Sequence, residues 1–220
     1  MGQRSIQGIL FDNDGTLVDT YNLILRSFDY ATRSVLGHTL PASVVMKKVG
    51  QPLVTQIADL SDDAVERQAL WDAYQEYNQS HHDDEVHLFP EVIPVLEQLR
   101  GAGFSLGVVT SKRHVMCQRG LDITGISDYF SCLIGKEDCT AFKPAPGPVV
   151  AGAAALGLDT SACLYIGDSP YDMESGKAAG TRTIAALWGM FQPSELAACH
   201  PDAVCETFSE LPRAIRHLGN

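Results

Sequence analysis

Two carboxylates separated by one residue follow the first apolar segment of the chain, in the run Phe11-Asp12-Asn13-Asp14-Gly15. Such a pair could be two turn residues that face water. It could also be a nucleophile and a proton carrier, because one carboxylate can attack phosphorus to give an acyl-phosphate and a second acid can protonate the leaving oxygen. Gly15 would let the backbone turn tightly after them. The pattern alone leaves both interpretations open.

Three further groups of polar residues also come directly after apolar segments. Thr110 and Ser111 could donate hydroxyl and backbone N–H groups to a phosphate, although a hydroxyl at this position is more often a helix cap. Lys143 precedes a proline in Phe-Lys-Pro-Ala-Pro, and its charge could offset the repulsion between a carboxylate nucleophile and a phosphate. Asp168 and Asp172 form a second acidic group without a neighbouring His or Cys, which suits a hard cation and Mg²⁺ best. Asp172 could equally be the partner of Lys143 or cap a helix.

The segments that carry these groups are short, apolar and β-branched, as expected of strands buried on both faces. Helical patterns lie between them and end near glycines. This alternation predicts an α/β fold with a doubly wound, Rossmann-like parallel sheet, in which ligands bind beyond the carboxyl ends of the strands. The expected strands are Ile6–Phe11, Ser105–Val109, Cys132–Ile134, Cys163–Ile166 and Thr183–Leu187, and the expected helices are Glu91–Leu99, Pro148–Leu156 and Asp172–Ala179.

The stretch from residue 19 to residue 84 has almost no strand signal and predicts a small all-helical cap, leaving 1–18 and 85–220 as the α/β core. Its core should contain Leu70, Trp71, Tyr74 and Tyr77, and the polar segment Ser80–Glu85 suits a hinge. We interpret His81-His82-Asp83-Asp84 as part of this solvated hinge, because it lacks the ligand spacing of a zinc site. The expected cap helices are Tyr21–Leu36, Pro41–Val49, Leu53–Leu60 and Asp62–Gln79.

Composition limits the function classes. A formal net charge of −11 argues against a nucleic-acid partner, and it requires that any phosphate site be made attractive locally by a metal or a placed lysine. No apolar run approaches the length of a membrane span, and no secretory signal is present. Six cysteines without a C-x-x-C pair then favour reduced thiols and a cytoplasmic location. The sequence does not separate a monomer from a homodimer.

Taken together, the polar groups resemble the motifs of the haloacid-dehalogenase-like superfamily of hydrolases. The resemblance rests on Phe-Asp-Asn-Asp-Gly-Thr-Leu-Val-Asp-Thr near the start, Val-Val-Thr-Ser-Lys, Phe-Lys-Pro-Ala-Pro, and Ile-Gly-Asp-Ser-Pro-Tyr-Asp later in the chain. It covers nearly the whole chain, since the superfamily also carries a helical cap after the first motif. Asn13 departs from the pattern, because that position is more often apolar.

The resemblance implies a role for each motif residue. Asp12 would be the nucleophile and Asp14 the general acid/base, while Thr110 and Lys143 would bind the transferring phosphoryl group. Mg²⁺ would be held by the side chains of Asp12 and Asp168 and by the backbone carbonyl of Asp14, with Asp172 supporting the waters of the metal or Lys143. Backbone amides near Asn13 and Ser111 would complete the phosphate cradle. Apart from the resemblance, we expect the cap loop around Gly50–Leu53, with Gly50 and Gln51, to contact the leaving group.

Asp14 also narrows the reaction. Dehalogenase and phosphonate-cleaving relatives lack an acid two residues after the nucleophile, so a leaving group that needs a proton fits better. The pattern resembles the phosphoglycolate phosphatase subgroup, which implies hydrolysis of a small phosphorylated metabolite such as 2-phosphoglycolate. The cap segment Tyr74–Asp83 also resembles a pyrophosphate-cleaving branch of that subgroup. A different class remains open, an inactive relative that binds a phosphorylated ligand or a protein.

Overall fold

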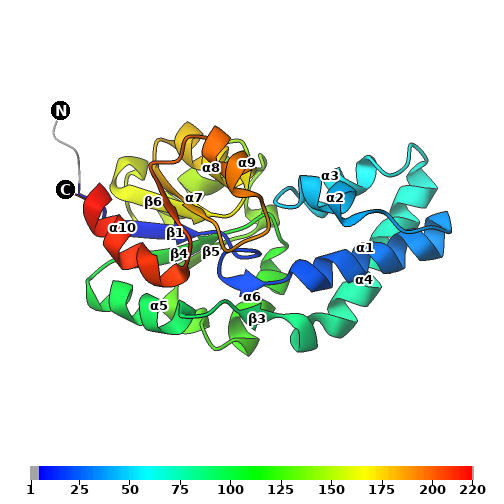
Figure 1. Cartoon of the computed structure of the whole chain (residues 1–220), viewed down its shortest axis with the longest axis horizontal. Helices are drawn as coiled ribbons and strands as arrows, with labels where there is room; N and C mark the ends of the chain where they lie inside the picture. The colour runs from blue at the N-terminus through cyan, green and yellow to red at the C-terminus, as the bar shows by residue number, and fades with distance from the viewer. Residues whose placement is uncertain (1–4, 220) are drawn as a thin grey trace.

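A computed structural model describes residues 5–219 as two lobes joined through two chain crossings (Figure 1). The larger lobe contains a sheet in the order β5-β4-β1-β6-β7-β8, in which every neighbouring pair is parallel. Its strands are β1 (Gly8–Phe11), β4 (Ser105–Val109), β5 (Cys132–Ile134), β6 (Cys163–Gly167), β7 (Arg182–Ala186) and β8 (Ala203–Cys205). The predicted α/β fold class with a doubly wound parallel sheet is confirmed.

Helices cover both faces of this sheet. The core helices are α5 (Val92–Gly101), α6 (His114–Ile123), α7 (Gly147–Ala155), α8 (Pro170–Ala179), α9 (Pro193–Ala198) and α10 (Leu211–Leu218). Short 3₁₀ turns lie at Ser127–Tyr129, Lys136–Asp138, Thr160–Ala162 and Phe208–Glu210. Helices α7 and α8 pack together and against the sheet, and α5 packs with α10 in the other main apolar cluster.

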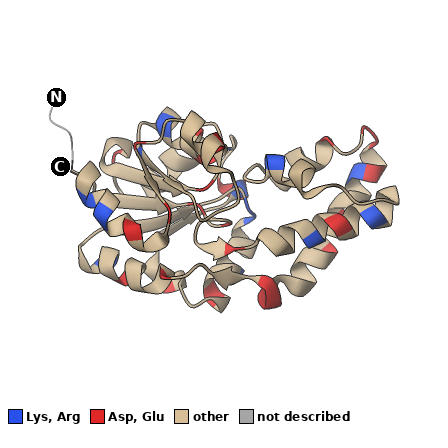
Figure 2. Ribbon diagram, in the orientation of Figure 1, with Lys and Arg blue, Asp and Glu red and all other residues tan. Residues whose placement is uncertain are grey.

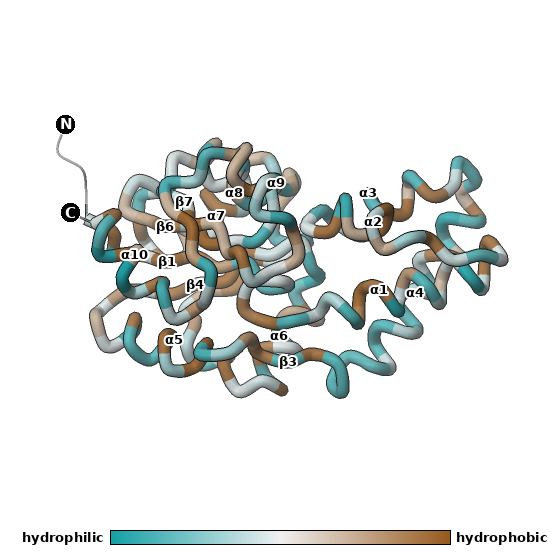
Figure 3. The backbone as a smooth tube through the Cα atoms, in the orientation of Figure 1, coloured by the Kyte–Doolittle hydropathy of each residue, from teal (hydrophilic) through white to brown (hydrophobic). Residues whose placement is uncertain are grey.

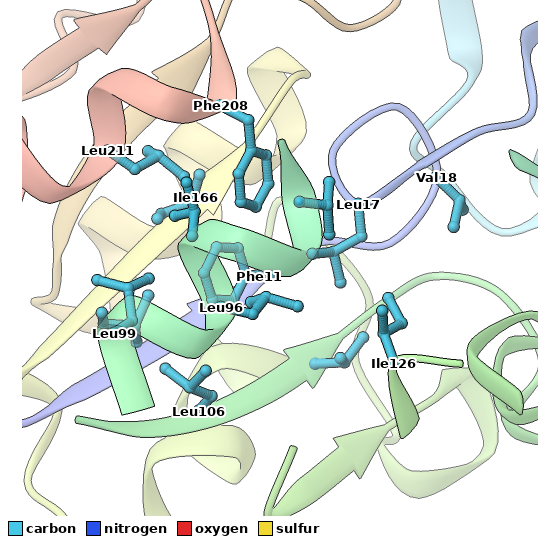
Figure 4. Packing of buried hydrophobic residues seen from close by; sticks show 14 of the residues in the cluster. Phe11, Leu17, Val18, Leu96, Leu99, Leu106, Ile126, Ile166, Phe208 and Leu211 are labelled. Atoms are coloured by element: carbon cyan, nitrogen blue, oxygen red, sulfur yellow. The ribbon is translucent and has the colours of Figure 1, made fainter. Parts of the chain in front are cut away.

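Side-chain alternation along β1 explains why both faces must be covered. Ile9 and Phe11 belong to one buried cluster, whereas Leu10 belongs to the cluster on the other face. Figure 4 shows Phe11 among side chains from α5 and from the segment that contains Phe208 and Leu211. In Figure 3 the central strands are the most apolar part of the backbone, which is the pattern of strands buried on both sides.

The smaller lobe consists of helices α1 (Tyr21–Leu36), α2 (Ala42–Val45), α3 (Leu53–Ala58) and α4 (Ala64–Glu85), with a 3₁₀ turn at Met46–Lys48. Its own apolar cluster includes Phe28, Ile57, Leu70 and Tyr74, and the Phe28 and Tyr74 rings meet edge to face at 4.9 Å. An antiparallel ribbon of β2 (Val18–Asp19) and β3 (His87–Leu88) lies where the chain passes between the lobes.

The structure of the cap differs from the sequence-based prediction in four places. Ser80–Glu85 is not a hinge, because α4 continues through it to Glu85. His82 in this segment is fully buried rather than solvated. Tyr77 packs against the large core cluster instead of the cap cluster, and it stacks on His81 at 4.0 Å. The predicted helix Pro41–Val49 is α2 followed by a 3₁₀ turn.

Between residues 5 and 219, no helix is both long enough and apolar enough to cross a membrane. The six cysteines are free thiols.

Candidate active site

The four polar groups found in the sequence meet at one edge of the parallel sheet. Asp12 follows β1, Thr110 follows β4 and Asp168 follows β6, and these strands are direct neighbours. Lys143 reaches the same place from the segment between β5 and α7. Because the carboxyl ends of parallel strands share one edge, residues more than a hundred positions apart come into contact here.

Lys143 is the centre of a buried ion-pair network. Its Nζ donates to Asp12 Oδ1 at 2.8 Å and to Asp172 Oδ1 at 2.7 Å, and the three side chains are at most 5% exposed. Burial would lower the pKa of Lys143, but the two carboxylates outweigh this effect and raise it. The lysine is therefore charged, and Asp172 orients it toward Asp12.

Asp172 is itself held in place by neutral donors. Its Oδ2 accepts from the Ser169 backbone N–H at 3.1 Å and from the Ser169 hydroxyl, and Tyr165 Oη lies 3.0 Å from its Oδ1. Ser169 and Asp172 also form the capping box that begins α8. Both interpretations offered for Asp172, a lysine partner and a helix-cap residue, thus describe real contacts.

Three carboxylates, those of Asp12, Asp168 and Asp172, can place one oxygen each within 4.8 Å of one another. Burial raises the pKa of Asp12 to about 7 even though Lys143 opposes this, and burial and the two other carboxylates raise that of Asp168. Ionisation of all three acids beside one lysine would leave an excess of two negative charges in a dry site, and this repulsion is one reason why the two pKa values are raised. A hard divalent cation with oxygen ligands would remove this excess, so the donor set fits Mg²⁺.

Asp168 is fixed by the turn that follows Asp12. Its Oδ1 accepts from Thr16 Oγ1 at 3.3 Å, and its Oδ2 accepts from the Met190 backbone N–H at 2.7 Å. Gly15 has φ of +84°, and a Cβ there would fall within 2.3 Å of Asp168 Oδ2. The glycine of the D-x-D-G pattern is thus required both for the turn and for the approach of Asp168.

Asp14 is held by three donors. Its Oδ1 accepts from Lys112 Nζ at 2.8 Å and from Thr20 Oγ1 at 2.9 Å, and its Oδ2 accepts from Asn13 Nδ2 at 3.1 Å. Burial would raise the pKa of Asp14, but Lys112 and the other donors lower it. Asn13, unusual at its position in the resemblance, is buried and contacts the adjacent acid.

A cavity of about 100 Å³ opens between this sheet edge and the cap. Asp12, Asp14 and Thr110 line it from the core, and Gly50 and Gln51 line it from the cap. Lys143, Asp168 and Asp172 are absent from its lining and lie beneath it. Asp12, Asp14 and Thr110 therefore lie at the surface of the cavity, and Lys143 lies directly behind Asp12, which it contacts at 2.8 Å.

The cap loop contacts the core directly. Ser111 Oγ donates to the Gly50 carbonyl at 2.6 Å, and Tyr171 Oη donates to the Lys47 carbonyl at 3.3 Å. Gly50 has φ of +98°, and a Cβ there would come within 3.0 Å of Ser169 Oγ. The cap loop therefore closes one side of the cavity and is held there by contacts with the core.

Sequence reasoning missed several residues of the site. Lys112 and Thr20 both hold Asp14. Each is the last residue of a motif given above, and this position close to the candidate site residues could have indicated a role for them. Trp188 donates its Nε1–H to the Thr16 carbonyl at 3.0 Å and steadies the loop that follows Asp14. Tyr165 is a buried strand residue that nothing in the sequence marks as polar in function.

Comparison with known proteins gives the same assignment. The family model of haloacid dehalogenase-like hydrolases matches residues 9–186. The pyrophosphatase PpaX of Oceanobacillus iheyensis is 34% identical over 94% of this chain and 95% of its own. PpaX of Bacillus velezensis is 32% identical over 96% and 97%. The crystal structure of a predicted phosphoglycolate phosphatase from Haemophilus somnus 129pt superposes with a TM-score of 0.87 at 25% identity, covering 96% of this chain and 99% of that one. The chain therefore belongs to the haloacid dehalogenase-like hydrolases, and the predicted family and phosphatase enzyme class are confirmed.

Proposed function

We propose that this protein is a Mg²⁺-dependent phosphatase that hydrolyses a small phosphate compound through an aspartyl-phosphate at Asp12. The observation that carries the proposal is the position of Asp12. Its carboxylate lines the cavity, and its Oδ1 lies 2.8 Å from the buried ammonium of Lys143. A carboxylate held against a fixed positive charge can approach a phosphoryl group that would otherwise repel it.

In the first step Asp12 would attack phosphorus while Lys143 and the Thr110 hydroxyl bind the phosphoryl oxygens. The leaving oxygen would take a proton from Asp14, which lines the same cavity. Because Lys112 lowers the pKa of Asp14 in the substrate-free protein, Asp14 would have to take up that proton from water or from the substrate as the substrate binds. In the second step the ionised Asp14 would take a proton from water, which attacks the acyl-phosphate and frees Asp12. The metal, held by Asp12, Asp168 and the Asp14 backbone carbonyl with support from Asp172, would supply charge neutralisation at the phosphoryl group.

Pyrophosphate is the substrate that the curated relatives favour, because those named above are called pyrophosphatases and match nearly the whole chain. The resemblance in sequence favoured 2-phosphoglycolate, and a structural relative carries that name. Both molecules join the scissile phosphate to a small anionic group. The inactive-relative alternative is disfavoured, since the nucleophile, acid, lysine and metal-binding carboxylates are present together.

A substrate panel tests the proposal. Phosphate release with Mg²⁺ should be measured for pyrophosphate, 2-phosphoglycolate, sugar phosphates and nucleotides, with and without EDTA. We expect turnover of pyrophosphate or 2-phosphoglycolate that EDTA abolishes and added Mg²⁺ restores. Failure to release phosphate from any member of the panel would refute the assignment. The cytoplasmic location stays a prediction, which cell fractionation would test.

Metal binding should change how stability depends on pH. The pKa of Asp12 is raised from 3.8 to about 7 in the metal-free fold. Between these pH values the folded protein binds the Asp12 proton more tightly than the unfolded chain does. The stability that this proton contributes is therefore present at low pH and is lost as the pH rises toward about 7. A cation that binds the ionised site should therefore stabilise the protein more at about pH 8 than at about pH 5.

Thermal unfolding with and without Mg²⁺ at the two pH values checks this expectation. Asp12→Asn is the comparison variant. It removes both the titrating group and one expected ligand of the cation, so Mg²⁺ should raise its Tm less than that of wild type at about pH 8. An equal rise in Tm with Mg²⁺ at both pH values would contradict the prediction.

A further inference from the structure

The cavity between the lobes is small and asymmetric in charge. At about 100 Å³ it lies below the range of about 300–1,000 Å³ that is usual for sites that bury drug-sized ligands. Its only acidic lining residues are Asp12 and Asp14, whereas three cations line it from the core, namely Lys112, Arg113 and Lys136. Figure 2 shows Lys and Arg at the edge of the core that faces the cap.

Two of these cations already have carboxylate partners. Lys112 Nζ lies 2.8 Å from Asp14 Oδ1, and Arg113 Nε lies 3.3 Å from Glu137 Oε1. Lys136 differs, because within residues 5–219 it forms no ion pair. Its Nζ lies 5.9 Å from the centre of the Trp71 ring, which belongs to the cap and also lines the cavity.

The local fold keeps the neighbouring acids away from Lys136. Glu137 accepts from the His114 backbone N–H at 3.0 Å, and Asp138 pairs with His114 Nδ1 at 2.8 Å. Both carboxylates therefore bind groups of His114 at the start of α6 rather than the ammonium of Lys136. The Lys136 backbone N–H donates to the Lys112 carbonyl at 2.9 Å, so the turn that carries Lys136 is joined to the loop that follows β4.

We infer that Lys136 binds a negatively charged leaving group, so that the enzyme selects phosphates whose leaving group carries a second oxyanion. This inference rests on the proposed phosphatase function and adds its substrate class. Trp71 holds the ammonium at the cavity by a cation–π contact that neutralises no charge, leaving the lysine free to pair with an anion. In a protein with a net charge of −11, a doubly anionic substrate needs such a placed charge. A neutral leaving group of the same size would gain nothing from it.

A matched substrate pair tests the inference. 2-Phosphoglycolate and 2-hydroxyethyl phosphate differ chiefly in the carboxylate, and pyrophosphate is the third substrate. We expect Lys136→Gln to lower kcat/KM for 2-phosphoglycolate and pyrophosphate by roughly 10- to 100-fold, mainly through KM. The value for 2-hydroxyethyl phosphate should change by less than about threefold. Trp71→Leu should reproduce part of the selective loss, because it removes the ring that holds the lysine.

Lys177→Gln is the control for loss of one positive charge, since Lys177 is exposed on α8 and does not line the cavity. It should leave all three substrates unchanged. An equal effect of Lys136→Gln on anionic and neutral leaving groups, or none on any of them, would overturn the inference while the phosphatase function stands. Wild-type protein that hydrolyses none of the three compounds would overturn both.

Discussion

Asp12→Asn should lower turnover of every phosphate substrate on the order of 10⁴-fold or more, because an amide oxygen cannot form the acyl-phosphate that splits the reaction into two steps. Substrate contacts from Thr110, Lys143 and the cap remain in the variant, so KM should change far less than kcat. Rapid acid quench with ³²P-labelled substrate should trap a phosphoenzyme with wild type and none with the variant.

The fold of Asp12→Asn should survive, and this separates loss of chemistry from loss of structure. Asp12 is one of three clustered buried carboxylates, so its neutralisation relieves their repulsion while Lys143 keeps its 2.7 Å contact with Asp172. The Tm of the metal-free variant should therefore equal or exceed that of wild type at about pH 8. Asp84→Asn, an exposed carboxylate outside the cavity, is the matched control and should retain full activity. Turnover by Asp12→Asn close to that of wild type would refute the mechanism.

The core of the fold could be predicted because its strands are buried on both faces. Such strands are short apolar runs with sharp ends, and Ser105–Val109 and Cys132–Ile134 match β4 and β5 at both ends. The helix Tyr21–Leu36 also matches at both ends, since Gly37 closes it in the left-handed conformation. The ribbon of β2 and β3 escaped notice, because two residues give no measurable period, and the three-residue edge strand β8 was also missed.

The hinge was mispredicted for a physical reason. Ser80–Glu85 is polar, and polarity suggests a solvated linker, but each of its residues tolerates a helix and none is Gly or Pro. Tertiary contacts then favour the helix. Arg119 of α6 pairs with Asp83, and His82 is buried where α4 meets α6. Such contacts depend on which surfaces meet, and that information is not local in the sequence.

The residues of the candidate site could be predicted from the sequence, but the contacts that several of their side chains make could not. The rule that ligands bind beyond the strand ends brought Asp12, Thr110 and Asp168 together. It could not show that Lys112 pairs with Asp14, or that the Ser111 side chain binds the cap at Gly50 while Thr110 of the same motif lines the cavity. These contacts depend on the direction of each side chain and on how the cap packs against the core. In sequence alone, Lys112 could equally be a surface residue and Ser111 a helix cap.

Lys143→Met should be the most destabilising single change among the site residues. The substitution keeps an unbranched side chain but removes the only positive charge that contacts Asp12 and Asp172 among residues 5–219, and both carboxylates are almost fully buried. Loss of one partner from a buried ion pair typically costs about 3–5 kcal/mol, because the remaining charge has neither water nor a counter-ion. Urea denaturation of the metal-free protein at about pH 8 measures this loss, which should shrink at about pH 5, where protons can neutralise the carboxylates.

Surface lysine Lys47 supplies the comparison, because it is exposed and forms no ion pair within residues 5–219. Lys47→Met should change the free energy of unfolding by no more than about 0.5 kcal/mol. Mg²⁺ should recover part of the stability of Lys143→Met but little of its activity, since a cation held by Asp12 and Asp168 offsets their charge without replacing the ammonium at the phosphoryl oxygens. A metal-free Lys143→Met protein as stable as Lys47→Met would mean that the three carboxylates are not ionised together in the folded state. In that case the excess negative charge from which a divalent metal is inferred would not exist.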